Sequence, residues 1–143
     1  MQEAAAPLSL IVEVVRAQSP SEFTLAFDDM AKSRVDSVVV TEDGEFASSF
    51  RAIATLALAE NLPSIGAVEY ADAGGLIGYG VNILALYRRA AYFVDRILKG
   101  VKPADLPIEQ PTRFELVLSL RTARTLNLTV PQSLLARADR VIE

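Results

Sequence analysis

The sequence predicts an α/β fold in which helices flank a mainly parallel sheet. Short runs rich in valine and isoleucine alternate with amphipathic stretches along the chain, and this alternation is typical of strand–helix–strand units. The chain has 143 residues, of which 51% are hydrophobic and 22% are charged. It is therefore long enough and apolar enough to form one domain with one core.

Two strands are expected in the first third of the chain. Leu8–Val15 (LSLIVEVV) and Asp36–Val40 (DSVVV) are short apolar runs, which predict strands buried on both faces of a sheet. Between them, Ser19, Pro20 and Glu22 form a capping-box pattern that begins a helix. A strand, a helix and a strand of these lengths predict a right-handed βαβ unit.

A second helix and a third short strand follow. Ser48 or Ser49 would begin the helix, and Asn61 would end it because asparagine tolerates the left-handed cap conformation. Pro63–Val68 is the strand candidate. The next stretch, Glu69–Asn82 (EYADAGGLIGYGVN), is dense in glycine. It predicts a tight connection, a ligand-facing loop or a hinge.

The second half begins with one long amphipathic helix. Asn82 caps this helix, which extends to about Lys99 with a broad apolar face that another surface must bury. The remaining expected elements are an extended crossing segment at Lys102–Pro111, a strand at Phe114–Leu120, a short helix at Arg121–Asn127 and a last helix from Thr129 to Val141.

The composition narrows the classes of function. Histidine and cysteine are absent, which removes the usual general base, thiolate nucleophiles and the commonest metal ligands. The net charge is −4 and no basic run exceeds two residues, so we expect no nucleic-acid partner. No apolar run is long enough to span a membrane. We therefore expect a protein that is not an enzyme and has no cofactor, metal site or membrane span.

Polar and aromatic side chains follow the strand at Asp36–Val40. Glu42, Asp43 and Glu45 could form an acid–base pair or a cation site. A solvated loop that caps the next helix is favoured, because no histidine or cysteine completes such a site. Phe46 is either an aromatic wall of a ligand site or a packing contact with the following helix.

The glycine-rich stretch adds two further candidates. Its glycine spacing matches neither the dinucleotide fingerprint nor the P-loop. Tyr79 either presents its phenol to a cleft or is a core tyrosine whose hydroxyl reaches solvent. The cleft is favoured, because Asn82 follows on the same connection and can serve as both a helix cap and a polar contact.

From about Val35 onward, the chain resembles the C-terminal half of the ABC-transporter substrate-binding protein family that includes tryptophan- and tyrosine-type binding proteins. The strings that carry the resemblance are EYADAGGLIGYGVN (69–82), YRRAAYFVDRILKGVKPADLPIEQPTRFELVLSL (87–120) and LTVPQSLLARADRVIE (128–143). The resemblance implies one Rossmann-like lobe of a type I periplasmic binding protein, a fold whose full-length members have two lobes.

The resemblance also implies a set of ligand-binding residues. They are Asp43, Phe46 and Ser48 in the family's Asp-Pro loop and the helix after it, Glu69 in its Arg-Glu-Phe string, and Tyr79 and Asn82 in its Tyr-Gly-x-Asn string. The chain departs from these strings at Gly44, Val68, Gly78 and Val81. The family has proline, arginine, serine and proline at these four positions.

The same resemblance divides the chain between lobes. Residues 8–68 and 112–143 would build the core of one lobe, and residues 69–82 would be a hinge-like connection. The helix at residues 82–100 would pack on the other lobe. We expect a chain with one lobe to form a homodimer, with helix exchange as one route.

Two functional hypotheses follow. The first is non-enzymatic solute binding for an ABC importer, in which a small organic molecule such as an amino acid is passed to an ABC permease. The second is a stand-alone interaction or regulatory module derived from that lobe, with little or no ligand binding. The first hypothesis implies a periplasmic or exported protein. The chain shows no signal peptide, so it would be cytoplasmic if Met1 is the natural start.

Overall fold

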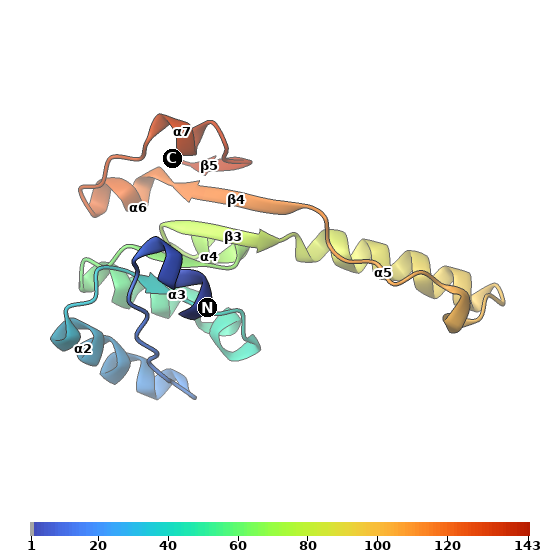
Figure 1. The fold of residues 1–143 in the computed structure, drawn as a ribbon, viewed down its shortest axis with the longest axis horizontal. Coiled ribbons are helices and arrows are strands. Elements are labelled where there is room, and N and C mark those ends of the chain that lie inside the picture. The colour runs from blue at the N-terminus through green and yellow to red at the C-terminus, as the bar shows by residue number, and fades with distance from the viewer. Residues whose placement is uncertain (1) are drawn as a thin grey trace.

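The computed structural model describes residues 2–143, which are organised around one five-stranded sheet of order β1-β2-β3-β4-β5 (Figure 1). The strands are β1 (Val38–Val39), β2 (Ser64–Gly66), β3 (Ile77–Val81), β4 (Phe114–Ser119) and β5 (Arg140–Ile142). All neighbouring strands pair in parallel except β3 and β4, which are antiparallel. The predicted α/β class with a mainly parallel sheet is confirmed.

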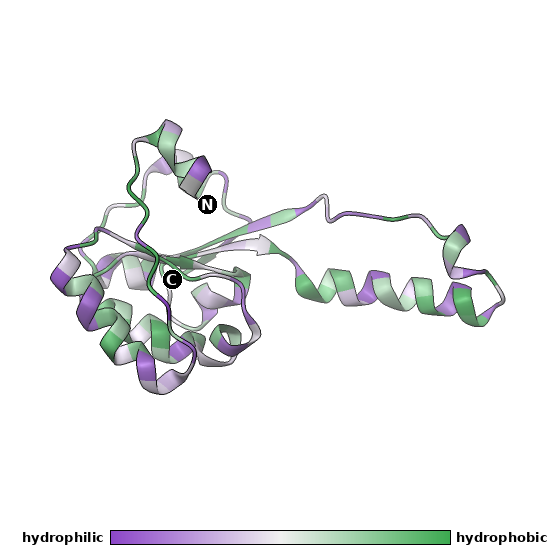
Figure 2. Cartoon of the chain, turned by 60° about the horizontal axis from the view of Figure 1, so that its bottom comes forward, coloured by the Kyte–Doolittle hydropathy of each residue, from purple (hydrophilic) through white to green (hydrophobic). Residues whose placement is uncertain are grey.

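Helices α2 (Phe23–Ser33), α3 (Gly44–Ala59) and α4 (Val68–Asp72) gather on one face of the sheet (Figures 1 and 2). A long helix, α5 (Ile83–Leu98), extends away from this body. The short elements are α1 (Gln2–Ala5), α6 (Leu120–Thr125), α7 (Gln132–Leu135) and the 3-10 turns η1 (Ala6–Leu8), η2 (Pro20–Glu22) and η3 (Pro103–Asp105).

The main core lies where α3 and α4 meet the sheet, and Tyr70 is at its centre. Its side chain is fully buried, meets the Phe50 ring edge to face at 5.4 Å between centroids, and donates a hydrogen bond from its hydroxyl to Ser64 Oγ at 2.9 Å. A Cβ on Gly66 would lie 2.7 Å from the Tyr70 ring, and one on Gly75 would lie 2.2 Å from it. Only glycine leaves room for this ring.

The glycine-rich stretch contains most of α4, the turn after it, β3 and Asn82. Gly74 has a φ of +113°, a backbone conformation that glycine adopts without strain. Gly78 lies against the start of α4, because a Cβ there would be 2.4 Å from the Val68 carbonyl oxygen. The glycines therefore allow a tight turn and close contacts with α4. That residues 69–82 act as a hinge stays a prediction, because it concerns movement between lobes.

The arm consists of α5 and the segment that returns to β4 (Figure 1). Asn82 caps α5 as predicted, since its Oδ1 accepts a hydrogen bond from the Ala85 amide at 2.8 Å. Arg89 of α5 binds the return segment. Its Nε donates a hydrogen bond to Glu109 Oε2 at 2.6 Å, and its guanidinium lies 4.2 Å from the Tyr92 ring centroid. This hydrogen-bonded pairing raises the pKa of Arg89 and lowers the pKa of Glu109.

The rest of α5 is open to solvent. Among the described residues, none in α5 is buried. Eight of its large apolar side chains are exposed. Tyr92 is one of them and lies against Arg89. We call the other seven the apolar arm face: Ile83, Leu84, Leu86, Tyr87, Val94, Ile97 and Leu98. Across residues 2–143, no helix has both the length and the apolar character needed to cross a membrane.

The strand predicted at Leu8–Val15 is wrong. Beyond the turn η1, this segment is extended but belongs to no strand. Its apolar composition predicted burial on both sides, yet Ile11 is 99% exposed and Val14 is 65% exposed. Val12 and Val15 are half-buried, so the segment packs along one side only. The predicted βαβ unit therefore lacks its first strand.

Two other boundaries differ from the predictions. Helix α3 begins at Gly44, not at Ser48 or Ser49, because Asp43 caps it by accepting a hydrogen bond from the Glu45 amide at 2.9 Å. The last predicted helix is only the single turn α7. Val141, the expected end of that helix, instead lies in β5, which pairs in parallel with β4.

Candidate ligand-binding site

The candidate site is the edge of the sheet where β1, β2 and β3 end. These three strands are parallel, so their carboxyl ends share one edge, where open α/β sheets bind ligands. Residues 40–43 lead from β1 to α3, Ala67 leads from β2 to α4, and Asn82 leads from β3 to α5. All three connections are short, so each helix begins close to this edge.

Two carboxylates and an amide gather around Gly80 on one face of β3. A Cβ on Gly80 would lie 2.7 Å from Glu42 Oε1, so the Glu42 carboxylate occupies that space. Glu115 of β4 is the partner of Gly80 across the antiparallel pair, and paired residues point to the same face. Asn82 Nδ2 donates to Glu115 Oε1 at 2.8 Å. This face of the edge is therefore acidic.

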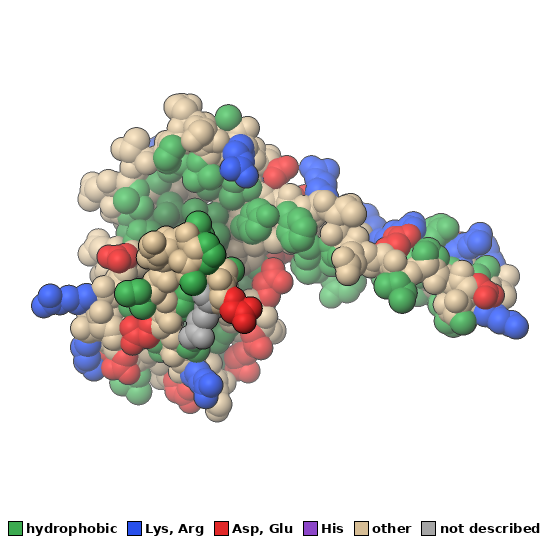
Figure 3. Space-filling model, viewed as in Figure 1, with side chains coloured by type: hydrophobic (Ala, Val, Ile, Leu, Met, Phe, Trp, Pro, Cys, Tyr) green, Lys and Arg blue, Asp and Glu red, His purple; other side chains and the backbone are tan. Residues whose placement is uncertain are grey.

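An aromatic pair lies on the opposite face of β3. Tyr79 alternates with Gly78 and Gly80, so its side chain points away from the acidic cluster. Its ring stacks on Phe114 at 5.9 Å between centroids with an interplanar angle of 17°. Both side chains are 52% exposed. This pair marks the base of the arm, and Figure 3 shows hydrophobic side chains extending from the body to the beginning of the arm.

The side chains that follow β1 have local contacts. Asp43 caps α3, and Ser48 Oγ donates to the Glu45 carbonyl oxygen within that helix at 2.7 Å. The Phe46 ring turns into the body and lies 5.8 Å from the Phe23 ring. This contact is with the preceding helix α2 and not with the following helix, as one of the two alternatives expected, because Phe46 itself belongs to the first turn of α3.

The six predicted residues thus fall into separate groups. Asn82 joins Glu42 and Glu115 on one face of β3, and Tyr79 lies on the other face. Glu69 is exposed in the first turn of α4, after the carboxyl end of β2. Among the described residues, no group of three or more acidic side chains could hold a metal ion.

Sequence reasoning missed Glu115 and Phe114. Glu115 is 33 positions from Asn82, and only the antiparallel pairing of β3 with β4 brings the two together. The run FELVLS was expected to be a strand, but nothing within it identifies its neighbours. A correct pairing of this run with the Ile77–Val81 strand would have found both residues.

Comparison with known proteins agrees with this architecture. A family model described as ABC transporter substrate binding protein matches residues 1–142, and the chain therefore belongs to that family. No curated protein matches the sequence.

Solved structures share the fold. One is an ABC domain in complex with L-Trp from Streptococcus pneumonia, with 27% identity and a TM-score of 0.88 over 99% of this chain and 49% of that one. Another is a conserved domain protein from Vibrio cholerae O1 biovar El Tor, with 23% identity and a TM-score of 0.89 over 98% of this chain and 47% of that one.

A ligand-free, open substrate-binding protein with adhesive properties from Clostridium difficile is also similar, with 19% identity and a TM-score of 0.69 over 99% of this chain and 47% of that one. The chain spans less than half of the length of each of these structures.

Proposed function

We propose that this chain forms one lobe of a solute-binding protein for an ABC importer, and that it binds a small organic molecule without changing it chemically. The observation that carries the proposal is the carboxyl edge, where Glu42, Asn82 and Glu115 lie on one face of β3. Family membership supports it, as does the similar ABC domain that was solved with L-Trp. The proposed role requires an exported location and an ABC permease as partner.

The chemistry of this edge favours an amino acid with an apolar or aromatic side chain. Glu42 and Glu115 offer carboxylates to an ammonium group, and charge-assisted hydrogen bonds of this kind are strong. Tyr79 and Phe114 offer an exposed aromatic surface at the same end of β3 but on its opposite face, so they would contact a side chain that reaches round the end of the strand. An amino acid with an apolar or aromatic side chain carries both the ammonium group for the carboxylates and a side chain for these rings.

The binding cleft requires a second lobe. A single lobe supplies only part of the buried contact area, so its affinity would be low. The apolar arm face is exposed, and we expect this apolar surface to form the contact with that second lobe. We propose that a second copy of this chain covers it in a homodimer when no other lobe is present. Residues 69–82 would then act as the hinge between arm and body.

A thermal-shift screen of amino acids tests the ligand. We expect apolar and aromatic amino acids to raise the melting temperature of the assembled protein, and Glu42→Gln to reduce that shift because one carboxylate is lost. Glu60→Gln is the matched control, since Glu60 lies at the opposite end of α3. The absence of any shift across the panel would contradict solute binding.

Light scattering tests the homodimer. We expect the chain to be dimeric, and the double variant Tyr87→Glu/Val94→Glu to be monomeric because it places charges on the apolar arm face. Arg96→Glu, elsewhere on α5, changes a charge outside that face and should leave the dimer intact. A monomeric wild-type chain would contradict this assembly.

The same exposed face supports a second candidate, an interaction or regulatory module. The apolar arm face consists of seven exposed side chains of α5, and an apolar surface of this kind is typical of protein-binding sites. This candidate predicts that the dimer forms while no amino acid shifts the melting temperature. The two measurements together therefore distinguish the candidates.

A further inference from the structure

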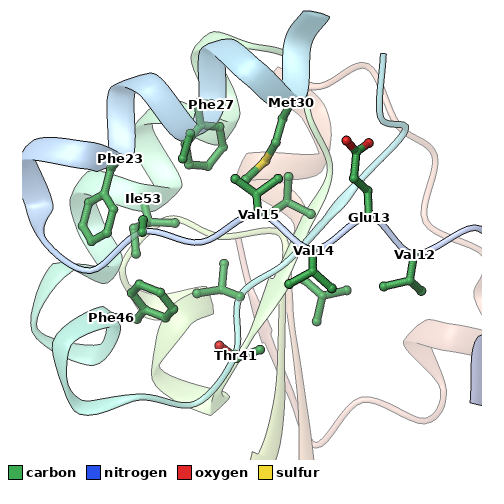
Figure 4. A pocket seen from close by; sticks show the side chains of 15 residues that line it. Val12, Glu13, Val14, Val15, Phe23, Phe27, Met30, Thr41, Phe46 and Ile53 are labelled. Carbon is green, nitrogen blue, oxygen red and sulfur yellow. The ribbon is translucent and has the colours of Figure 1, made fainter. Parts of the chain in front are cut away.

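A separate, half-open apolar pocket lies in the body, between the extended segment 12–17 and the elements β1, α2 and α3 (Figure 4). Its volume is about 240 Å³. Phe23, Phe27 and Met30 of α2 line one side, and Phe46 and Ile53 of α3 line another. We call it the internal pocket. It is distinct from the acidic face at Gly80, although Thr41 belongs to the connection at that edge and Phe46 to the helix that begins there.

The wall of the internal pocket favours an uncharged ligand. Of its fifteen lining residues, only Glu13 and Thr41 have polar side chains. Glu13 Oε1 accepts a hydrogen bond from Ser33 Oγ at 3.1 Å, and its carboxylate points away from the hollow in Figure 4. A charge inside would therefore lose its hydration without gaining a partner, which is costly. An apolar cavity of about 150 Å³ is already large enough to bind benzene.

The segment that covers the internal pocket can open at low cost. Among the described residues, the backbone of residues 11–17 makes no hydrogen bond to other backbone groups. Val12 and Val15 pack against the body, and the Glu13–Ser33 contact adds one exposed hydrogen bond. Segments held by so few contacts open locally far more often than the whole fold does. This gives a small molecule a route of entry.

We propose that the internal pocket binds a small uncharged aromatic molecule of one or two fused rings. The three phenylalanine rings and Met30 provide the contact surface, and aromatic and thioether groups favour such contacts. Thr41 at one end offers a hydroxyl to a ring N–H. This site goes beyond the proposed function, since it needs only residues of this lobe and excludes the charged groups of a free amino acid.

Calorimetry with indole tests the proposal, with tryptophan as the charged analogue that carries the same ring. We expect indole to bind the chain, and Ala17→Leu to weaken indole binding at least tenfold, because the longer side chain fills the internal pocket. Ala31→Leu is the matched control, since Ala31 is an exposed residue of α2 outside the pocket, and it should bind indole like the wild type. Tryptophan should not compete with indole.

Two further measurements keep the proposal testable if Ala17→Leu does not fold. Met30→Ala enlarges the internal pocket, so it should shift the preference from benzene towards naphthalene. Bound indole should slow amide hydrogen exchange at residues 11–17.

The proposal is overturned if indole does not bind, if it binds Ala17→Leu as well as Ala31→Leu, or if Met30→Ala leaves the preference unchanged. Slow exchange at residues 11–15 in the free chain would also overturn it, because the segment would then pair with β1 and close the pocket. Amino-acid binding at the carboxyl edge is measured separately, so either proposal can fail alone.

Discussion

The guanidinium of Arg140 makes two parallel hydrogen bonds to the carboxylate of Asp72, from Nη1 to Oδ1 and from Nη2 to Oδ2, each at 2.6 Å. The two residues are 68 positions apart, and the pair joins β5 to the end of α4. Their side chains are 47% and 50% exposed. The hydrogen bond from Arg140 lowers the pKa of Asp72.

We expect Asp72→Asn to lower the free energy of unfolding by about 0.5–1 kcal/mol at pH 7, because solvent screens a half-exposed pair. A lowered folded-state pKa stabilises the fold above the ordinary value of 3.8, and this contribution is lost as the pH falls through the folded-state pKa. Urea denaturation of both proteins at pH 7 and in acid checks this. The difference should vanish in acid, and Asp29→Asn, in a more exposed pair, should have a smaller effect.

Gly75→Ala and Gly44→Ala should change stability in opposite directions. A Cβ on Gly75 would lie 2.2 Å from the buried Tyr70 ring, so we expect a loss of about 1–3 kcal/mol from overpacking. Gly44, the first residue of α3, has no neighbour within 4 Å of a Cβ. Alanine there should stabilise by about 0.4–1 kcal/mol, because it restricts the unfolded chain. Chemical denaturation measures both, and a shift in the same direction would contradict the structure.

The hydrogen bond between Tyr70 and Ser64 should appear as a coupling energy. Tyr70→Phe leaves Ser64 Oγ buried without its donor, and we expect it to cost about 1–2 kcal/mol. The double variant Tyr70→Phe/Ser64→Ala should cost less than the sum of the single variants. Burial raises the pKa of the Tyr70 hydroxyl, so the hydroxyl stays neutral and the coupling should not change between pH 6 and pH 9. Additive losses would show that the bond contributes nothing.

Asn82 should control the first turn of α5 through its side-chain oxygen. Asn82→Ala removes the cap on the Ala85 amide, which typically costs about 1 kcal/mol. Amide hydrogen exchange of α5 should therefore become faster in its first turn.

Asn82→Asp separates the two roles of this side chain. It keeps an oxygen for the cap but removes the donor to Glu115 and places two carboxylates together. The Ala85 amide should stay protected in Asn82→Asp and lose protection in Asn82→Ala. Equal exchange in the two variants would contradict the cap.

Local sequence patterns predicted the positions of strands and helices more reliably than they predicted which strands lie next to each other. The run at Phe114–Leu120 was expected to be a strand, and β4 confirms it. Its antiparallel pairing with β3 and parallel pairing with β5 were not predicted, because alternation of side chains reports only which face a residue occupies within its own strand. The apolar run at Leu8–Val15 was wrongly predicted to be a strand, since composition alone could not reveal that only one side of it is packed.

The sequence by itself determined the α/β class, the Asn82 cap and the broad apolar face of α5, because these depend on residues close together in the chain. Only the tertiary structure decided that Asn82 meets Glu115, that Tyr79 stacks on Phe114 and that Phe46 turns inward to Phe23. Each of these contacts joins segments far apart in sequence. Such contacts depend on how the whole chain packs, which local periodicity does not encode.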